Sequence, residues 1–284
     1  MLFLMLLKEL YLVKTIHLHL VSDSTGETVS HVARASLVQF DDVQVEEHLW
    51  SMVRSERQVA DIVKNIGEKP GFVLYTVVDS MVQAALEKGC RELHVPCVSV
   101  LQPIVNTLRG FFGQEGHARP GGQHVLDAEY FNRIAAMDYV LSHDDGQSTH
   151  TLNGADIILV GVSRTSKTPT CIYLGNRGIR AANVPMVPGS DLPPELFNLD
   201  GPLVIGLTKD PKRLVEIRKQ RLKILNQDQN TDYVDFEMVT KEINDARRLF
   251  TRNDWPTINV SRKSIEETAA TIIQLHMRRQ EGDT

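Results

Sequence analysis

Apolar and polar residues follow two different periods along the first part of the chain. Short runs rich in β-branched and other apolar residues predict four strands, at Thr15–Val21, Val43–Leu49, Gly71–Val78 and Leu93–Val98. Helical spacing of apolar residues predicts helices between them, at Glu27–Phe40, Glu56–Ile66 and Met81–Lys88. Because strands that alternate with helices usually pair in parallel, we predict an N-terminal α/β domain with a mostly parallel sheet over residues 15–112.

The same alternation returns in the second half of the chain. Residues Ala155–Val160 form a short apolar run that leads directly into a loop beginning with glycine, and a helix is expected over Lys167–Arg177. One further strand and three helices are predicted at Leu203–Leu207, Pro211–Leu225, Val234–Phe250 and from Ser264 onward, where Ser264 and Glu267 fit a capping box. We therefore predict a second α/β domain, which contains the loop, over residues 151–284.

A glycine-rich segment separates the two halves. Gly113–Gly122 contains four glycines and one proline, which predicts a flexible loop or lid, and Ala128–Tyr139 has helical spacing. Residues 113–150 are thus expected to form a lid and a connecting helix. Residues 1–14 are expected to lie outside the core, because the apolar run Met1–Leu7 is too short to span a bilayer and no small-residue cleavage site follows it.

The composition is that of a globular protein. The chain has 284 residues, of which 42% are hydrophobic and 24% charged, and its net charge is -5, so neither nucleic acid nor a membrane is an expected partner. Cys90, Cys97 and Cys171 form no Cys-x-x-Cys pair, which favours a reducing cytoplasm and argues against a structural zinc site. Because the net charge is negative, any binding of phosphate must depend on a local cluster of residues.

The loop after the Ala155–Val160 strand carries the strongest chemical signal. A Walker-type loop has a glycine after a buried strand, amides that converge on phosphate oxygens, a lysine for the terminal phosphates and a hydroxyl for magnesium. Gly161, Lys167 and Thr168 stand at those positions, whereas Ser166 replaces the second glycine and makes the motif less specific. The predicted phosphate-binding residues are Gly161, Val162, Ser163, Arg164, Thr165, Ser166, Lys167 and Thr168.

A strand-to-helix turn with a solvent-exposed lysine is the alternative interpretation of this loop. The apolar strand before it favours phosphate binding, and Pro169 supports a helix start there. Arg164, in the middle of the loop, could contact a transferring phosphoryl group as an arginine finger does, or form a structural salt bridge.

Two polar clusters are further candidates. Ser22–Gly26 offers three hydroxyls, the carboxylate of Asp23 and helix N-terminal amides, which suits orthophosphate or a hydroxyl acceptor, or else an N-cap formed by Ser24 or Thr25. His143–Gly146 places Asp144 and Asp145 beside an imidazole, which is enough for a magnesium ligand, a general base, or both, or else for a polar turn.

Two other polar segments have a structural interpretation first. Arg119–His124, with Asp127, suits a glycine-hinged lid over substrate, although a surface loop is the simpler explanation. The basic residues of the Pro211–Leu225 helix indicate a solvated face first, and a contact with an acidic partner or with phosphate second; they are Lys212, Arg213, Arg218, Lys219, Arg221 and Lys223.

These motifs together resemble the pyruvate, phosphate dikinase regulatory proteins, a family that also includes the phosphoenolpyruvate synthase regulatory proteins. The resemblance runs from about Thr15 to the last helix and continues through Ala182–Pro185, Gly206–Thr208 and Ser264–Glu267. Ser22–Thr28 and the pair Thr165-Ser166 are similar to the dikinase branch, whereas the synthase branch carries Cys-Gly before the lysine. Ser166 is thus a family trait.

The resemblance implies a bifunctional enzyme. Its members use ADP to phosphorylate a threonine in the dikinase active site, which inactivates the dikinase, and use orthophosphate to remove that group with release of pyrophosphate. If so, Lys167 would hold the β-phosphate of ADP, and Thr168 and Asp144 would be ligands for Mg²⁺. Asp144 or Asp145 is the expected base for the acceptor hydroxyl, with Asp23 as second choice.

Two other functions remain open from the residues alone. A P-loop kinase for a small metabolite would need no protein partner, and a nucleotide-sensing regulatory module would bind ADP and transfer nothing. The oligomeric state also remains open, with a homodimer compatible with the sequence.

Overall fold

The protein consists of two compact units, which we describe separately. The computed structural model describes residues 16–41, 43–122, 128–228 and 231–282, and the chain divides into unit 1, Met1–Val125, and unit 2, Leu126–Thr284. The expected extension at residues 1–14 lies outside the described residues. No helix within these ranges is long and apolar enough to cross a membrane.

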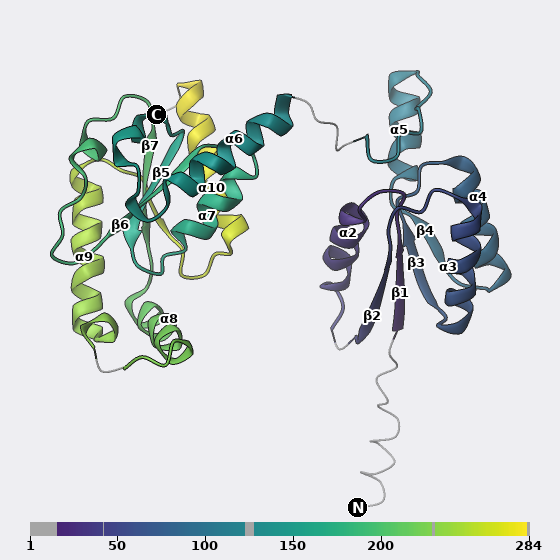
Figure 1. Ribbon diagram of the computed structural model, residues 1–284, viewed down its shortest axis with the longest axis horizontal. Helices are drawn as coiled ribbons and strands as arrows, with labels where there is room; N and C mark the ends of the chain where they lie inside the picture. The colour runs from purple at the N-terminus through teal and green to yellow at the C-terminus, as the bar shows by residue number, and fades with distance from the viewer. Residues whose placement is uncertain (1–15, 42, 123–127, 229–230, 283–284) are drawn as a thin grey trace, which may run out of the picture. The chain divides into compact units, whose positions relative to one another are not determined.

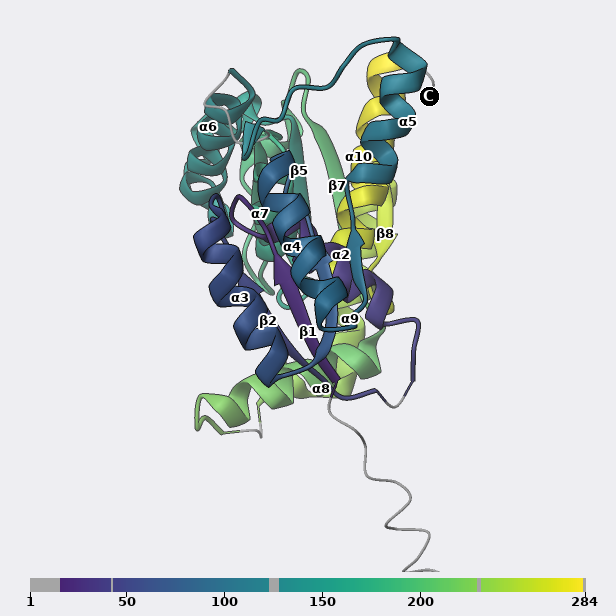
Figure 2. The same cartoon turned by 90° about the vertical axis from the view of Figure 1, so that its right-hand side faces the viewer.

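Unit 1 is a four-stranded parallel sheet with helices on both faces (Figure 1). The strand order is β2-β1-β3-β4, and its elements are β1 (Ile16–Val21), α2 (Glu27–Leu37), β2 (Val45–Trp50), α3 (Glu56–Glu68), β3 (Gly71–Tyr75), α4 (Ser80–Glu92), β4 (Cys97–Ser99) and α5 (Gln102–Phe112). Leu18 and Leu20 pack with α2 on one face, while Val21 packs with α3 and α4 on the other. Helices α3 and α4 lie side by side in both views (Figure 1 and Figure 2).

Unit 2 repeats this architecture. Its parallel strand order is β6-β5-β7-β8, and its helices and strands are α6 (Ala128–Ser142), β5 (Ile157–Val162), α7 (Lys167–Gly175), β6 (Ala181–Met186), β7 (Leu203–Thr208), α8 (Pro211–Ile224), α9 (Phe236–Arg252), β8 (Thr257–Asn259) and α10 (Ile265–Glu281). Short 3-10 turns lie at Asp144–Gly146, Thr149–Gly154, Pro194–Phe197 and Asp232–Val234. The predicted capping box at Ser264 and Glu267 is confirmed.

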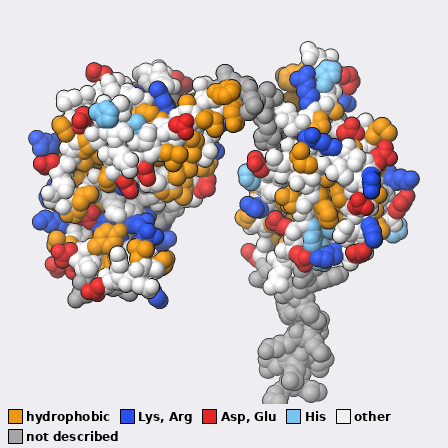
Figure 3. Space-filling view, in the orientation of Figure 1, with side chains coloured by type: hydrophobic (Ala, Val, Ile, Leu, Met, Phe, Trp, Pro, Cys, Tyr) orange, Lys and Arg blue, Asp and Glu red, His pale blue; other side chains and the backbone are white. Residues whose placement is uncertain are grey.

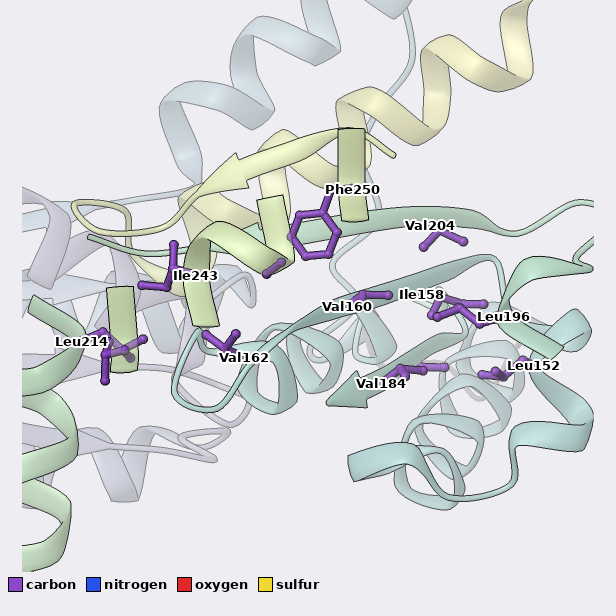
Figure 4. Close-up of a cluster of buried hydrophobic side chains, with 14 of the residues drawn as sticks. Leu152, Ile158, Val160, Val162, Val184, Leu196, Val204, Leu214, Ile243 and Phe250 are labelled. Carbon is purple, nitrogen blue, oxygen red and sulfur yellow. The ribbon is translucent and has the colours of Figure 1, made fainter. Parts of the chain in front are cut away.

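The two faces of this second sheet bury separate clusters. Ile158 and Val160 of β5 pack with Ile243 and Phe250 of α9 on one face (Figure 4). The alternate residues of β5 pack with α7 and α10 on the other face. Because both faces are covered, all six residues of β5 are buried, and the strand ends at the loop that carries the candidate chemistry.

The predicted fold class is confirmed. Both halves of the chain are α/β, and each contains its own four-stranded parallel sheet. Three elements were not predicted: α5, β6 and β8. β6 contains two alanines, Asn183 and Pro185, which do not form a strand-like run, but the proline is tolerated because β6 is an edge strand.

Candidate active site

Gly161, which the sequence placed at the start of the loop, still belongs to β5 and pairs with Leu207 of β7. A side chain at Gly161 would place its Cβ 2.7 Å from the backbone oxygen of Leu207 and 2.9 Å from Oγ1 of Thr165. Those distances are shorter than real contacts of a Cβ, so glycine is required here. Gly161 thus lets β5 pack tightly against β7 just before the strand ends at Val162.

The loop then turns through two residues with positive φ. Arg164 has φ +72° and Ser166 has φ +66°, both in the left-handed region that favours glycine. Between them, the buried Thr165 donates a hydrogen bond from Oγ1 to the backbone oxygen of Val162 at 2.9 Å. The prediction that a residue with a β-carbon must adopt the turn at Ser166 is confirmed.

Lys167 begins helix α7 and lies behind the loop. Its side chain is 6% exposed, and Nζ donates to the backbone oxygen of Val162 at 3.2 Å. Burial lowers the pKa of Lys167 to about 8, and the nearby carboxylates of Asp145 and Asp144 oppose that shift. The alternative of a solvent-exposed lysine is therefore wrong.

Three segments far apart in sequence meet beside Lys167. Oγ1 of Thr168 donates to Oδ1 of Asp144 at 2.9 Å. Asn183, which is 1% exposed on β6, donates from Nδ2 to the same Asp144 oxygen, and its Nδ2 lies 2.9 Å from Oγ1 of Thr168 and 3.3 Å from Oδ1 of Asp145. The structure thus brings both predicted carboxylates to the loop. Hydroxyl and carboxylate oxygens are also the ligands that Mg²⁺ prefers.

The neighbouring histidine is structural. His143 is buried, stacks on Tyr139 with ring centroids 3.7 Å apart, and contacts the backbone oxygen of Tyr139 and Oγ1 of Thr151 through its two ring nitrogens. Asp144 and Asp145 lie in the short 3-10 turn Asp144–Gly146 that follows His143, where Asp145 adopts φ +49°. The polar turn and the carboxylate cluster are therefore the same feature.

Arg164 is exposed, and none of the ion pairs between described residues includes it. Its backbone oxygen accepts a hydrogen bond from Nζ of Lys209 at 3.1 Å. Lys209 is 6% exposed, and burial lowers its pKa. The side chain of Arg164 is thus exposed, while its backbone is held by Lys209, the residue that follows β7.

Arg218 corrects the prediction of a solvated basic face on α8, because its side chain is only 1% exposed. Its guanidinium forms a two-point ion pair with Glu242 of α9, at 2.8 and 3.0 Å. Nη2 also donates to the backbone oxygen of Ser163 at 3.2 Å, and the group lies 4.4 Å from the ring centroid of Tyr233. Arg218 therefore connects the loop to both α8 and α9.

A pocket of about 570 Å³ opens beside this end of the loop. Ser163 contributes to its wall, and the hydroxyl of Tyr233 lies 3.1 Å from Oγ of Ser163. Its apolar wall consists of Met186, Val187, Pro188, Tyr233 and Met238. The pocket therefore offers an apolar surface directly beside Ser163 of the loop.

Sequence reasoning missed Tyr233 and Glu242, placed Arg218 on a solvated face, and gave Asn183 no role in the site. One signal for Arg218 was available, because Leu214, Arg218 and Leu222 share one helical face by their spacing of four. Asn183 is a polar residue within an apolar run, but that pattern by itself predicts no partner.

Unit 1 has a smaller polar pocket at the end of β1. It has a volume of about 100 Å³, room for on the order of three water-sized groups. Its lining brings together the two segments Ser22–Thr28 and Arg119–Gly122, with the Cβ position of Gly121 3.2 Å from Oγ of Ser24. Helix α2 has Gly26 as N-cap and no side-chain cap, so the N-cap interpretation of Ser24 or Thr25 is wrong.

Asp23 is the carboxylate of that pocket. It is 3% exposed, and its Oδ2 accepts a hydrogen bond from the backbone amide of Val78 at 2.7 Å. Burial raises the pKa of Asp23, and that hydrogen bond opposes the shift. Asp23 belongs to unit 1, whereas Asp144 and Asp145 belong to unit 2. Gln123, His124 and Asp127 of the predicted lid lie outside the described residues.

The fold and these two sites define a class: an α/β protein with polar loops suited to phosphate at the carboxyl ends of its parallel strands. The family model described as kinase/pyrophosphorylase matches residues 18–273. The chain belongs to this kinase/pyrophosphorylase family. It is therefore an enzyme of phosphoryl transfer that uses a nucleotide and phosphate.

Relatives support the same family over almost the whole chain. A protein of Paramagnetospirillum magneticum, named as a pyruvate, phosphate dikinase regulatory protein, is 55% identical over 265 residues, covering 93% of this chain and 85% of its own. Proteins with the same name from Caulobacter vibrioides and Rhodospirillum rubrum are 51% and 52% identical, over 91% of this chain and 82% and 94% of their own.

Proposed function

We propose that this chain regulates pyruvate, phosphate dikinase by reversible phosphorylation of a threonine in the dikinase active site. It inactivates the dikinase by transferring the β-phosphate of ADP, and reactivates it by transferring that group to orthophosphate, which releases pyrophosphate. The family and the relatives' shared name support this target. The observation that carries the chemistry is the buried Lys167 behind a loop whose Thr168 contacts Asp144.

The loop holds the diphosphate of ADP. Its backbone amides and the N-terminus of α7 face the phosphate oxygens, and Lys167 supplies a positive charge close to the β-phosphate. A dianionic phosphate beside Lys167 offsets the cost of burying that cation, so the lysine is protonated when ADP is bound. The apolar pocket with Met186, Tyr233 and Met238 receives the adenine.

Asp144 and Asp145 take different roles because their surroundings differ. Asp144 already accepts hydrogen bonds from Thr168 and Asn183, and with Thr168 it would hold Mg²⁺, which neutralises charge on the transferring group when bound. Asp145 is exposed, so it is free to accept the proton of the acceptor threonine. Asp23 is the second choice as base, and Arg164 contacts the transferring phosphoryl group.

In each direction of the reaction, one bond to phosphorus forms while another breaks. In the kinase direction, the threonine hydroxyl oxygen bonds to the β-phosphorus of ADP, its proton goes to the base, and AMP leaves. In the phosphorylase direction, an oxygen of orthophosphate bonds to the phosphorus of phosphothreonine, and the threonine oxygen leaves with a proton from the same residue. The enzyme acts in the cytoplasm, which the pattern of its three cysteines favours.

The test uses ADP labelled in its β-phosphate, purified chain and pyruvate, phosphate dikinase. We expect label on a dikinase threonine, and release of pyrophosphate when the phosphorylated dikinase is given orthophosphate. Lys167→Ala should abolish both reactions, because both need the same cation, while Lys212→Ala, an exposed lysine on α8, should behave as wild type.

The other outcomes identify the competing functions. ADP binding with no transfer to any acceptor would leave a nucleotide sensor. Transfer to a small molecule without the dikinase would identify a metabolite kinase. Full kinase activity in Lys167→Ala would overturn the role of this loop.

A further inference from the structure

A second cluster of ligand-type side chains lies in unit 1, at the opposite end of its sheet from Ser22–Gly26. It consists of His17 on β1 and of Glu46 and His48 on β2. His17 precedes Ser22 by five residues along β1, which is roughly 16 Å in an extended strand. The cluster is therefore separate from the pocket described above.

Strand register brings these three side chains together. β1 and β2 pair in parallel with His17 opposite Glu46 and His19 opposite His48. Since alternate residues of a strand point to the same face, these four side chains share one face of the sheet. In the space-filling view, histidine reaches the surface beside acidic and basic groups at the end of unit 1 where β1 begins (Figure 3).

The donor atoms are spaced like the corners of a metal site. Nδ1 of His17 lies 3.1 Å from Nε2 of His48 and 3.5 Å from Oε2 of Glu46, and Nε2 of His48 lies 3.6 Å from Oε1 of Glu46. A tetrahedron of ligands about 2.05 Å from Zn²⁺ has edges of about 3.3 Å. With one donor atom from each residue, the three lie within 4.8 Å of one another, and the Glu46 carboxylate must turn for one oxygen to approach both nitrogens.

We propose that His17, Glu46 and His48 bind one Zn²⁺ ion with solvent in the fourth position. Two imidazoles and a carboxylate are a ligand set that Zn²⁺ takes in proteins. The side chains of His17 and His48 are 21% and 17% exposed and that of Glu46 is 47% exposed, so an ion can enter. The cysteine pattern argues against a structural zinc site, whereas these ligands are two imidazoles and a carboxylate from two strands.

His19 supports the site without being a ligand. Its Nε2 donates to the backbone oxygen of Lys69 at 2.9 Å, and its Nδ1 accepts from Nε1 of Trp50 at 3.3 Å, so both nitrogens are used. Its ring stacks on that of His48, with centroids 4.8 Å apart and planes inclined by 23°. His19 therefore holds the His48 ring in place beside His17.

Lys69 occupies part of the site in the absence of metal. Its Nζ lies 2.9 Å from Oε1 of Glu46, and its side chain is 52% exposed. Zn²⁺ must displace this cation from Glu46, which a long exposed side chain allows. Removal of the lysine charge should therefore strengthen metal binding, whereas loss of a ligand should weaken it.

The experiment is calorimetric titration of ZnCl₂ into untagged, chelator-stripped full-length chain. We expect one ion per chain in the wild type, and affinity at least tenfold weaker in His17→Ala, His48→Ala and Glu46→Gln. Lys69→Met, which keeps the backbone oxygen that His19 uses, should bind several-fold more tightly. His31→Ala, an exposed histidine on α2, is the matched control and should bind as wild type.

Cobalt tests the ligand type independently. Co²⁺ in this site should give visible bands without a thiolate charge-transfer band, since Cys90 and Cys97 of the same unit take no part. Equal affinity in wild type and His17→Ala, several weak ions unaffected by every substitution, or a thiolate band would each overturn the proposal. The Lys69→Met result decides the matter if a ligand variant fails to fold.

Discussion

Lys167 is a buried cation at the candidate active site. Its pKa falls to about 8 because the ammonium is buried, while an unfolded lysine titrates near 10.5. Between those two values the unfolded chain binds more protons than the folded one, so stability contributed by this group rises with pH. An anionic ligand opposes this lowering of the pKa of Lys167, because it favours the charged lysine.

We therefore predict that ADP binding takes up a proton at Lys167 at pH 8.5 to 9. Titration calorimetry in buffers of different ionisation enthalpy measures this uptake, which should approach one proton per chain and shrink toward pH 7, where Lys167 is already charged. Affinity for ADP should fall as pH rises through about 8. Lys212→Ala should keep the uptake. Equal uptake at pH 7 and pH 9 would contradict the assignment.

Asn183 is the second informative residue, because its Nδ2 contacts Asp144, Asp145 and Thr168 together. Removal of a hydrogen bond to a charged group costs about 1.5–3 kcal/mol, or roughly 10- to 150-fold in rate if it acts in the transition state. We predict that Asn183→Ala lowers the rate of phosphate transfer by that factor.

The rate is measured with labelled ADP in the wild type, Asn183→Ala and Asn244→Ala. Asn244 is exposed on α9 and should be silent. Wild-type transfer in Asn183→Ala, with its circular dichroism unchanged, would show that the three-residue contact has no part in the reaction.

At the scale of elements, helices α8 and α9 are connected through a buried ion pair. Arg218 and Glu242 have side chains 1% and 12% exposed. A buried charge that loses its partner is costly, whereas a pair replaced by apolar groups often is not. Arg218 also holds the loop through Ser163, so stability and the site depend on the same contact.

We predict that Arg218→Met destabilises unit 2 by about 3–5 kcal/mol, because Glu242 is left buried and unpaired. The double variant Arg218→Met with Glu242→Leu should recover part of that loss. Differential scanning calorimetry measures both, with Lys219→Ala on the exposed side of α8 expected within about 0.5 kcal/mol of wild type. A single variant as stable as Lys219→Ala would be inconsistent with this view.

At the scale of the molecule, the two units have separate hydrophobic cores. The buried residues of the unit 1 clusters extend to Val95, and those of the unit 2 clusters begin at Val140. A ligand stabilises only the cooperative unit whose native state it binds. The proposed ADP site lies in unit 2, and the proposed zinc site lies in unit 1.

We predict two calorimetric transitions that respond to different ligands. ADP at about 100 times its dissociation constant should stabilise one of them by about 2.7 kcal/mol and leave the other in place. Zn²⁺ should raise the midpoint temperature of the other transition. Lys167→Ala should lose only the response to ADP, and His17→Ala only the response to Zn²⁺. A single transition whose midpoint temperature is raised by both ligands would contradict the prediction that the two units unfold separately.

The sequence by itself predicted the elements whose apolar period is strong, and it predicted the loop Gly161–Thr168, because that chemistry is contiguous. It missed β6 and β8, since small residues, a proline and three-residue length leave no period to recognise. It also placed Arg218 on a solvated face, because charge alone does not reveal a buried partner on another helix.

Only the tertiary structure decided which side chains meet. Asp144, Thr168 and Asn183 come from three segments, and His17, Glu46 and His48 from two strands, and each group is assembled by strand order and register. Local sequence determines which conformation and chemistry a segment can have. Long-range pairing in the sheet determines the neighbours of that chemistry, and neighbours set its protonation and its ligands.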